Sequence, residues 1–301
     1  MQGRQVVAVV GPTATGKSDL GVALALALGG EVVNADSMQL YRGMDIGTAK
    51  LAPAERRGVP HHLLDVWDVT VTATAAGYQQ LCRAVLDDVR RRGKVPVVVG
   101  GSGLYVRAAL DELDFPGTDP DLRAELEAEL ARVGAPALHA RLAALDPAAS
   151  SRMEPTNGRR VVRALEVVLL TGTMPGRLTD YLPRYPTRYV GLDRDDLSDR
   201  VARRVERMWA GGLVDEVRIL ADRGLRDGVT ARRALGYAQV LAHLDGEYDE
   251  ATAKERTTVA TRRFVRRQRA WFGRDPRITW LPAGEDLLGR ALGVLRPSDH
   301  N

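Results

Sequence analysis

An octapeptide near the N-terminus constrains the fold of this chain more than any other feature. Residues 11–18 read GPTATGKS and fit the pattern GxxxxGK[ST], which is typical of a phosphate-binding P-loop. The segment follows a short β-branched run over residues 5–10 and precedes a helical pattern over residues 16–28. A loop in this position turns its backbone amides toward a phosphate, and the helix N-terminus adds partial positive charge.

The sequence therefore predicts that the whole loop binds a diphosphate. Lys17 supplies a mobile cation, and the Ser18 hydroxyl can hold Mg²⁺. The loop residues predicted to bind the diphosphate are Gly11, Pro12, Thr13, Ala14, Thr15, Gly16, Lys17 and Ser18.

Strand and helix patterns continue to alternate after the loop. Residues 31–36 and 95–99 have the pattern of buried strands, and residues 76–92 between them have that of a helix. This order is the mark of a doubly wound parallel sheet, in which ligands bind at the carboxyl ends of the strands. We therefore expect an α/β fold with a P-loop NTPase-like parallel sheet flanked by helices. Three unusual segments follow the strands, at residues 11–18, 36–50 and 100–105.

The pattern changes near residue 115. Asp119 and Pro120 are typical of a helix start, helices are predicted over residues 135–145 and 158–170, and no strand pattern lies between them. The predicted organisation is a P-loop catalytic core of residues 1–114 and 187–301 with an all-helical insertion domain of residues 115–186. In the second part of the core we expect strands at residues 188–192 and 277–281 and helices at residues 197–211, 213–223 and 250–272.

Composition excludes several classes of protein. The 301 residues are 45% hydrophobic, which suffices for one or two domains. The single cysteine, Cys82, excludes a disulfide framework and a cysteine-based zinc site, and is expected to be a buried apolar residue. No apolar stretch is long enough to span a bilayer, so we expect a soluble cytoplasmic protein with no membrane partner.

The acid that P-loop hydrolases use is absent from its usual strand. These enzymes hold Mg²⁺ with an aspartate at the end of a second strand. Here the strand pattern of residues 95–99 is followed by Gly100, Gly101 and Ser102, and not by an aspartate. An aspartate does end another strand, at Asp36. Position alone leaves Asp36 open as a strand-end cap, a Mg²⁺ ligand or a catalytic group. The pattern favours diphosphate as a leaving group, and a nucleotide-dependent kinase or ATPase is the alternative, which ATP turnover would test.

Several segments together carry a closer likeness. The chain closely resembles the tRNA dimethylallyltransferase family over roughly residues 5–282, and the string MDIGTAK at residues 44–50 is the most specific match. The other matching segments are residues 11–18, 36–43, 61–65, 100–105, 163–167, 236–237 and 261–272.

The resemblance implies transfer of a dimethylallyl group from its diphosphate to the exocyclic N6 amine of the adenosine at tRNA position 37, just 3′ of the anticodon. It makes Asp36 the general base and Thr13 the donor to the oxygen that leaves with the diphosphate. Lys17, Ser18 and Mg²⁺ would neutralise the developing charge. Arg204 matches a diphosphate-binding arginine, and Arg200 lies one helical turn earlier.

The resemblance also implies a partner, the anticodon stem-loop of tRNA, whose target base must leave its stack to reach the donor. A monomer is expected. Four residues depart from those usual in the family, namely Ser102, Glu154, Asn157 and Ala238. The residues that match RNA-contacting positions are Asp36, Ser37, Met38, Gln39, Ser102, Arg123, Arg159, Arg160, Val161, Val162, Arg163, Arg232, Arg233, Gly236 and Tyr237.

Residues 261–274 form an arginine-rich helical pattern. At about 100° per residue, the arginines from Arg262 to Arg269 cover one broad face and suit contact with phosphates, Arg266 and Arg267 among them. A solvated basic face is the alternative. The residues expected to pack into the core from the other face are Phe264, Val265, Trp271 and Phe272.

Other assignments stay open or are structural at this point. His61 and His62 lack further metal ligands nearby and are interpreted as structural, whereas Tyr105 and Tyr237 fit a core or a site equally well. Transfer to free AMP would need neither the insertion nor the basic helix, and a non-catalytic RNA-binding module would leave the P-loop unexplained.

Overall fold

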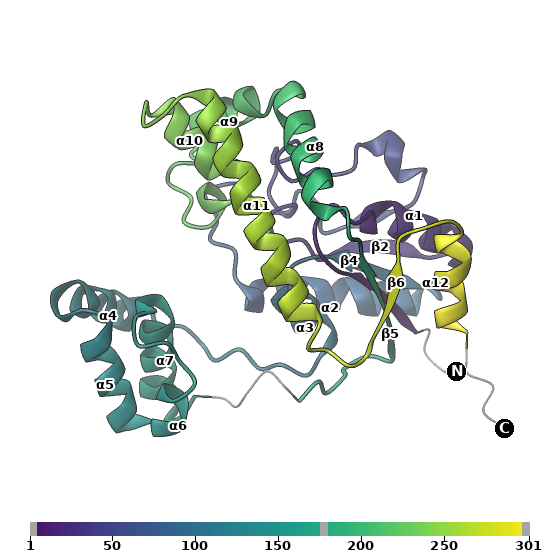
Figure 1. The fold of residues 1–301 in the computed structure, drawn as a ribbon. Helices are drawn as coiled ribbons and strands as arrows, with labels where there is room; N and C mark the ends of the chain where they lie inside the picture. The colour runs from purple at the N-terminus through teal and green to yellow at the C-terminus, as the bar shows by residue number, and fades with distance from the viewer. Residues whose placement is uncertain (1–4, 175–179, 297–301) are drawn as a thin grey trace. The chain divides into compact units, whose positions relative to one another are not determined.

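A six-stranded parallel sheet forms the centre of the larger unit (Figure 1). The computed structural model describes residues 5–174 and 180–296. All five strand pairings are parallel, and the strand order is β3-β2-β4-β1-β5-β6. The strands are β1 (Val6–Val10), β2 (Glu31–Asn34), β3 (His61–His62), β4 (Pro96–Gly100), β5 (Thr187–Asp193) and β6 (Ile278–Pro282). The predicted fold class, a P-loop-like parallel sheet flanked by helices, is confirmed.

Helices cover both faces of this sheet because its strands are apolar on both sides. Val7 and Val9 of β1 pack against α1 (Lys17–Leu28) and α12 (Leu287–Leu295) in one core cluster. Figure 1 shows α2 (Ala75–Arg91) and α3 (Gly103–Leu110) on the other side of the strands. The doubly wound arrangement places the loops after β1, β2 and β4 at one end of the sheet, where the site forms.

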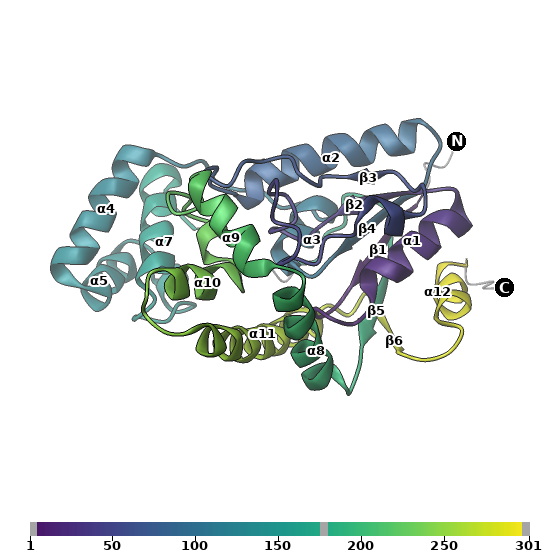
Figure 2. The same ribbon diagram turned by 90° about the horizontal axis from the view of Figure 1, so that it is seen from above.

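A second cluster of helices packs beside that end of the sheet (Figure 2). Its core joins Tyr41 and Met44, which lie in the loop after β2, to buried residues of four elements. The turn η1 (Pro53–Arg56), a 3-10 helix between β2 and β3 in the chain, is not part of this cluster. The helices of the cluster are α8 (Leu197–Ala210), α9 (Leu213–Asp222), α10 (Tyr237–Leu244) and α11 (Glu250–Phe272), with a short 3-10 turn at η2 (Ala231–Arg233). Their packing holds the loop of residues 36–50 against α9 and α10.

The chain divides into two compact units, and the second is Leu113–Tyr181. The residues described within this unit form the helices α4 (Pro120–Val133), α5 (Ala135–Leu145), α6 (Pro147–Ser150) and α7 (Gly158–Thr171) and no strand. The charged carboxylate of Glu166 is fully buried in it and accepts hydrogen bonds from Arg123, Arg163 and the amide of Asp119. Buried carboxylates need such partners, so Glu166 fixes the start of α4 against α7.

The predicted insertion boundaries, residues 115 and 186, differ from those of the structure. The difference at the C-terminal boundary has a clear cause, because the chain returns to the sheet unit before residue 186. The amide of Glu112 donates to Leu182 and the amide of Arg184 donates to Leu110, while Pro183 forms a bridge with Asp111. These long-range backbone pairs have no signature in the local sequence.

Candidate active site

The loop after β1 has the backbone of an anion-binding nest. Gly11, Ala14 and Gly16 have φ angles of 132°, 67° and 94°, so three of the eight loop residues take the positive φ that such a nest requires at some of its positions. Gly11 is required by space as well as by conformation, since a Cβ there would lie 2.2 Å from the carbonyl oxygen of Leu192 in β5. The Pro12 carbonyl accepts hydrogen bonds from the Thr15 hydroxyl and the Lys17 ammonium, which closes the loop on itself.

A cavity of about 1310 Å³ with many charged side chains in its lining, called the polar cavity below, opens over this loop. Five residues of the loop line it, namely Thr13, Ala14, Gly16, Lys17 and Ser18, together with Arg200 and Arg204 of α8. Gly11, Pro12 and Thr15 do not line it, although the sequence predicted the whole octapeptide as binding residues. They shape the loop instead, through the close approach of Gly11 to β5 and the hydrogen bond from the Thr15 hydroxyl to the Pro12 carbonyl. Proline also has no N–H to offer a phosphate.

A second, mostly apolar cavity of about 510 Å³ adjoins the first. Leu104 and Tyr105 after β4 and Phe264 and Trp271 of α11 contribute its apolar lining. The residues that line both cavities are Thr13, Asp36, Thr48, Gly101, Arg204 and Met208. The two predicted catalytic residues, Asp36 and Thr13, therefore lie where a charged cavity meets an apolar one.

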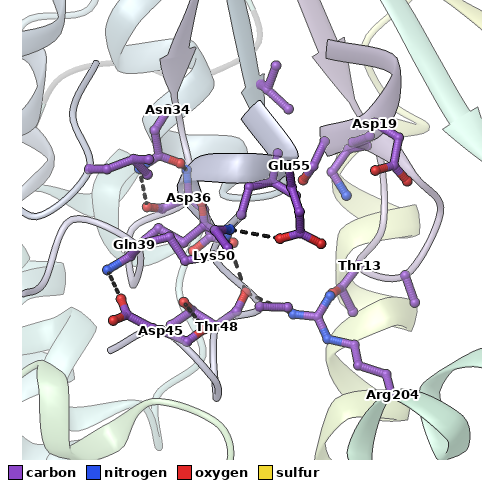
Figure 3. Close-up of a pocket in the computed structure, with 18 of the residues that line it drawn as sticks. Thr13, Asp19, Asn34, Asp36, Gln39, Asp45, Thr48, Lys50, Glu55 and Arg204 are labelled. Atoms are coloured by element: carbon purple, nitrogen blue, oxygen red, sulfur yellow. Dashed lines mark hydrogen bonds and ion pairs between the residues drawn. The ribbon is translucent and has the colours of Figure 1, made fainter. Parts of the chain in front are cut away.

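Asp36 is held in place by a fully used amide. Asn34, which is 4% exposed, accepts from the Asp36 amide and donates to the carbonyls of Asp36 and Leu63. One carboxylate oxygen of Asp36 accepts from the Met38 amide at 3.0 Å. Figure 3 shows the Asp36 side chain at the cavity, with Thr13 and Arg204 across from it. The geometry leaves the carboxylate rigid and open to a ligand, which suits a base.

Ser37 and Ser102 join the loops after β2 and β4. The Ser37 amide donates to the Ser102 hydroxyl, which in turn contacts the Ser37 hydroxyl at 3.2 Å. Ser37 and Ser102 line the apolar cavity, as does Met38, whereas Gln39 lines the polar one and donates to the Thr48 carbonyl. The structure thus brings this predicted group together around Asp36.

The P-loop cavity contains two basic side chains, Lys17 and Arg204, whose charged forms are destabilised by burial. Burial lowers the pKa of Lys17 to about 7, while the negative charge of Asp36 opposes that shift and Arg204 adds to it. Burial likewise lowers the pKa of Arg204, which Asp36 again opposes. Two cations beside one carboxylate form a site with an excess of positive charge, and this excess favours an anionic ligand.

The loop that contains MDIGTAK is fixed by one carboxylate that the sequence did not reveal. Glu216 of α9 accepts hydrogen bonds from the amides of residues 45–47 and from the hydroxyl of Tyr237. The loop then presents the carbonyl of Thr48 to Arg204, which donates to it at 3.0 Å. Glu216 thereby sets the position of a cavity arginine from a distance.

Several residues predicted to contact RNA are buried in the structure. Val161 and Val162 are 0% and 2% exposed, because they fill the core of the insertion. Tyr237 is 0% exposed and donates a hydrogen bond to Glu216, so of the two interpretations left open for it, the structure supports a core residue. Gly236, which precedes it, is also buried. Alternate helix faces explain the burial of the two valines, because residues adjacent to surface arginines on a helix turn inward.

The predicted RNA-contacting arginines fall into two groups. Arg123 and Arg163 bind Glu166, and Arg163 also donates to the carbonyls of Pro116 and Gly117, so both are structural in this unit. The second group is exposed and comprises Arg159, Arg160, Arg232, Arg233, Arg266 and Arg267.

The basic helix α11 differs from its predicted division into two faces. Val265 and Phe272 are buried as expected, but Trp271 is 37% exposed and packs over Gly103 at the apolar cavity, where Phe264 also lies. These two aromatics line a cavity rather than the core. Arg269 is not a free surface cation, since it forms an ion pair with Asp193. Arg266 and Arg267 remain exposed.

The remaining predictions concern structural residues. His62 bonds Glu31, His61 bonds the Val59 carbonyl, and Cys82 is fully buried. No cluster of three or more acidic, histidine or cysteine side chains that could hold a metal occurs within residues 5–174 and 180–296. In the same residues no helix has the length and apolar character needed to cross a membrane.

A P-loop between β1 and α1, set in a parallel sheet with a carboxylate at its mouth, defines the chain as a P-loop protein adapted to bind a phosphorylated ligand. A family model described as IPP transferase matches residues 39–275. The chain belongs to this family, and the resemblance deduced from the sequence is confirmed.

This chain is similar to curated relatives over nearly its full length. The tRNA dimethylallyltransferase of Thermobifida fusca is 64% identical over 299 residues, covering 96% of this chain and 94% of the relative. That of Salinispora tropica is 63% identical, covering 97% and 93%.

Solved structures agree as well. A tRNA isopentenylpyrophosphate transferase from Bacillus halodurans is 40% identical with a TM-score of 0.71, covering 96% of this chain and 94% of that one. A eukaryotic dimethylallyltransferase acting on tRNA is 25% identical with a TM-score of 0.81, covering 96% and 78%.

Proposed function

We propose that this protein transfers a dimethylallyl group from dimethylallyl diphosphate to the N6 amine of adenosine at position 37 of tRNA. The observation that carries the proposal is the placement of Asp36 and Thr13 where the two cavities meet. A diphosphate suits the cationic cavity, and a prenyl group beside an adenine suits the apolar one. The names of the relatives and of the family support the same reaction.

The residues divide the work of one substitution. The adenosine N6 attacks the first carbon of the allyl group, the bond from that carbon to oxygen breaks, and diphosphate leaves. Asp36 takes the proton that the amine loses, and the Thr13 hydroxyl donates a hydrogen bond to the departing oxygen. Lys17 and Arg204 face the charge that develops on the diphosphate.

Mg²⁺ fits this cavity through a single protein ligand. The Ser18 hydroxyl lies at the first turn of α1 and lines the polar cavity beside Lys17. Magnesium bound to a diphosphate takes most of its ligands from phosphate oxygens and water, so one hydroxyl suffices. When bound, the ion would supply further neutralisation of the leaving group's charge.

The RNA partner is proposed to be the anticodon stem-loop, bound by a monomer of the enzyme. Exposed arginines on α11 suit the phosphate backbone, and the aromatics Phe264 and Trp271 suit a base that has left its stack. The apolar cavity of about 510 Å³ is large enough for an adenine together with a five-carbon group.

Product analysis tests the proposal directly. Purified protein, dimethylallyl diphosphate, Mg²⁺ and bulk tRNA are incubated, and the nucleosides are separated after digestion of the RNA. N6-dimethylallyladenosine at position 37 is the expected product, with release of one diphosphate for each group transferred. ATP turnover is measured in parallel with and without tRNA. ATP consumption without prenyl transfer would overturn the proposal in favour of a kinase or ATPase.

Donor binding is expected to weaken with rising pH because of Lys17. Its pKa of about 7 leaves the side chain largely neutral at higher pH, whereas the diphosphate binds its charged form. Binding must then take up a proton, so affinity should fall by up to about tenfold per pH unit between roughly pH 7.5 and 9. Calorimetry in two buffers of different ionisation enthalpy measures the proton uptake.

The control for this experiment is Lys17→Arg, because a guanidinium stays charged throughout that range. Its donor affinity, at whatever level, should show a flatter pH dependence. Equal slopes for the two proteins would show that another group takes up the proton.

Loss of Arg266 and Arg267 is expected to weaken tRNA binding in a salt-dependent way. The double alanine variant removes two exposed cations from α11, so the plot of log K against log salt should become shallower by about two. Filter binding between low and physiological salt measures the slope. Arg91→Ala on α2 also removes an exposed arginine and should leave the slope unchanged. A slope unaltered in the double variant would place the RNA elsewhere.

A further inference from the structure

Gln268 bridges two of the loops that form the site. It lies on α11, is 5% exposed, and accepts a hydrogen bond from the Thr13 amide at 2.9 Å. Its own amide nitrogen donates to the Gly101 carbonyl at 2.8 Å. A Cβ at Gly101 would lie 2.4 Å from that nitrogen, so the close approach depends on glycine there. The chain segments joined are more than 160 residues from Gln268.

The bridge spans neighbouring strands. Thr13 follows β1 and Gly101 follows β4, and these strands pair in parallel up to Val10 and Gly100. Gln268 therefore ties together the two loops at the point where the cavities meet. The tie also occupies the Thr13 amide, which an open nest would offer to phosphate.

We propose that Gln268 is a positioning residue that fixes Thr13 by its main-chain amide, so that Thr13 serves the leaving group through its hydroxyl alone. The proposal rests on the reaction proposed above and assigns a residue that acts through Thr13 without touching the substrate's reacting atoms. It also connects the leaving-group donor to the helix that carries Arg266 and Arg267.

Only a neutral side chain with both a donor and an acceptor can make this bridge. A glutamate at this position would accept from Thr13, but its second oxygen would face the Gly101 carbonyl unless it carried a proton. A methionine has a similar length and volume and makes neither hydrogen bond. These two substitutions therefore separate the hydrogen bonds from the space that the side chain fills.

Gln268→Glu is expected to make turnover depend on pH in a way that the natural protein does not. Burial raises the pKa of a carboxyl, so the protonated form, which can make both bonds, persists at low pH. Relative to the unsubstituted protein, kcat should fall by about tenfold or more between roughly pH 6 and 9. Gln80→Glu, at an exposed site on α2, is the matched charge control and should follow the natural profile.

A double-substitution cycle with Thr13→Ala tests whether Gln268 acts through Thr13. Gln268→Met alone should lower kcat by about 30-fold or more while changing donor KM by less than about threefold. In the Thr13→Ala background the same substitution should cost less than about threefold, because the hydroxyl that it positions is gone. Full additivity in the cycle would overturn the proposal, as would a Gln268→Glu profile identical to that of Gln80→Glu.

A readout that needs no prenyl transfer separates this proposal from the proposed reaction. Hydrogen exchange at the Thr13 amide, followed by NMR, should be slow in the natural protein and at least about tenfold faster in Gln268→Met, with the thermal unfolding midpoint recorded for each variant. Slow exchange in Gln268→Met would contradict the proposal even if the transfer reaction is established. If the natural protein transferred no prenyl group, the proposed reaction would be wrong. The exchange result would then still report on the hydrogen bond between Gln268 and the Thr13 amide.

Discussion

Alanine in place of Asp36 is expected to lower kcat for prenyl transfer by about a thousandfold. Asn34 bonds the main chain of Asp36, and the Met38 amide donates to its carboxylate, which lies at the meeting point of the two cavities. The proposed reaction brings the incoming amine to this point. Without the carboxylate the amine must lose its proton to water. Single-turnover measurements with labelled donor and saturating tRNA report this loss directly, free of product release.

Donor and tRNA are expected to bind the Asp36→Ala variant still, since other residues form most of both cavities. One correction applies to the measurement. Asp36 raises the pKa of Lys17, so its removal lowers that pKa further and leaves less of the cation at neutral pH. Donor binding should therefore be compared near pH 6.5, where more of Lys17 stays charged.

Asp68→Ala is a suitable control, because its carboxylate is 70% exposed and pairs with Arg42 outside the cavities. Turnover in that variant should match the natural protein. If Asp36→Ala also kept near-normal turnover, the assignment of the base would be wrong.

Alanine in place of Gly11 is expected to destabilise the whole sheet unit by about 4 kcal/mol or more. The added Cβ would lie 2.2 Å from the Leu192 carbonyl, and the φ angle of 132° is one that alanine rarely adopts. Relief would require β1 and β5 to separate at their paired ends. Urea unfolding measures the loss as a shift in the transition midpoint at constant slope.

Gly29→Ala distinguishes steric overlap from backbone strain. Gly29 has a φ of 60° at the end of α1 and nothing within 4 Å of the added Cβ, so the expected cost is only about 1 kcal/mol. Similar midpoints for the two variants would show that the contact with β5 relaxes easily.

The local sequence predicted the P-loop and Asp36, but few of the residues that hold the site in place. The spacing of the P-loop fixed where β1 ends and α1 begins, and Asp36 stood out because it directly follows a strand pattern. Asn34, Glu216 and Gln268 were missed because their importance lies in hydrogen bonds to distant backbone groups, which leave no local pattern. The short strand β3 was missed because two residues show no periodicity.

The differences between prediction and structure on α11 and α7 have a shared physical origin. Periodicity distinguishes inward from outward faces but not a core from a cavity, so Trp271 was assigned to the core although it lines a pocket. Charge likewise predicts a surface but not a partner. Arg163 was expected on RNA, yet Glu166, buried three residues later on the same helix, binds it. Burial of that carboxylate could not be foreseen from composition.

The close packing of Gly47 against Tyr237 restricts which substitutions related sequences can accept at these two positions. A Cβ at Gly47 would lie 2.4 Å from the tyrosine ring, and the ring's hydroxyl is anchored on Glu216. Neither position can change size by itself without displacing the other or opening a void. Positions 47 and 237, although 190 residues apart, are therefore expected to covary in natural variants, with a larger side chain at 47 tolerated only where 237 has become smaller.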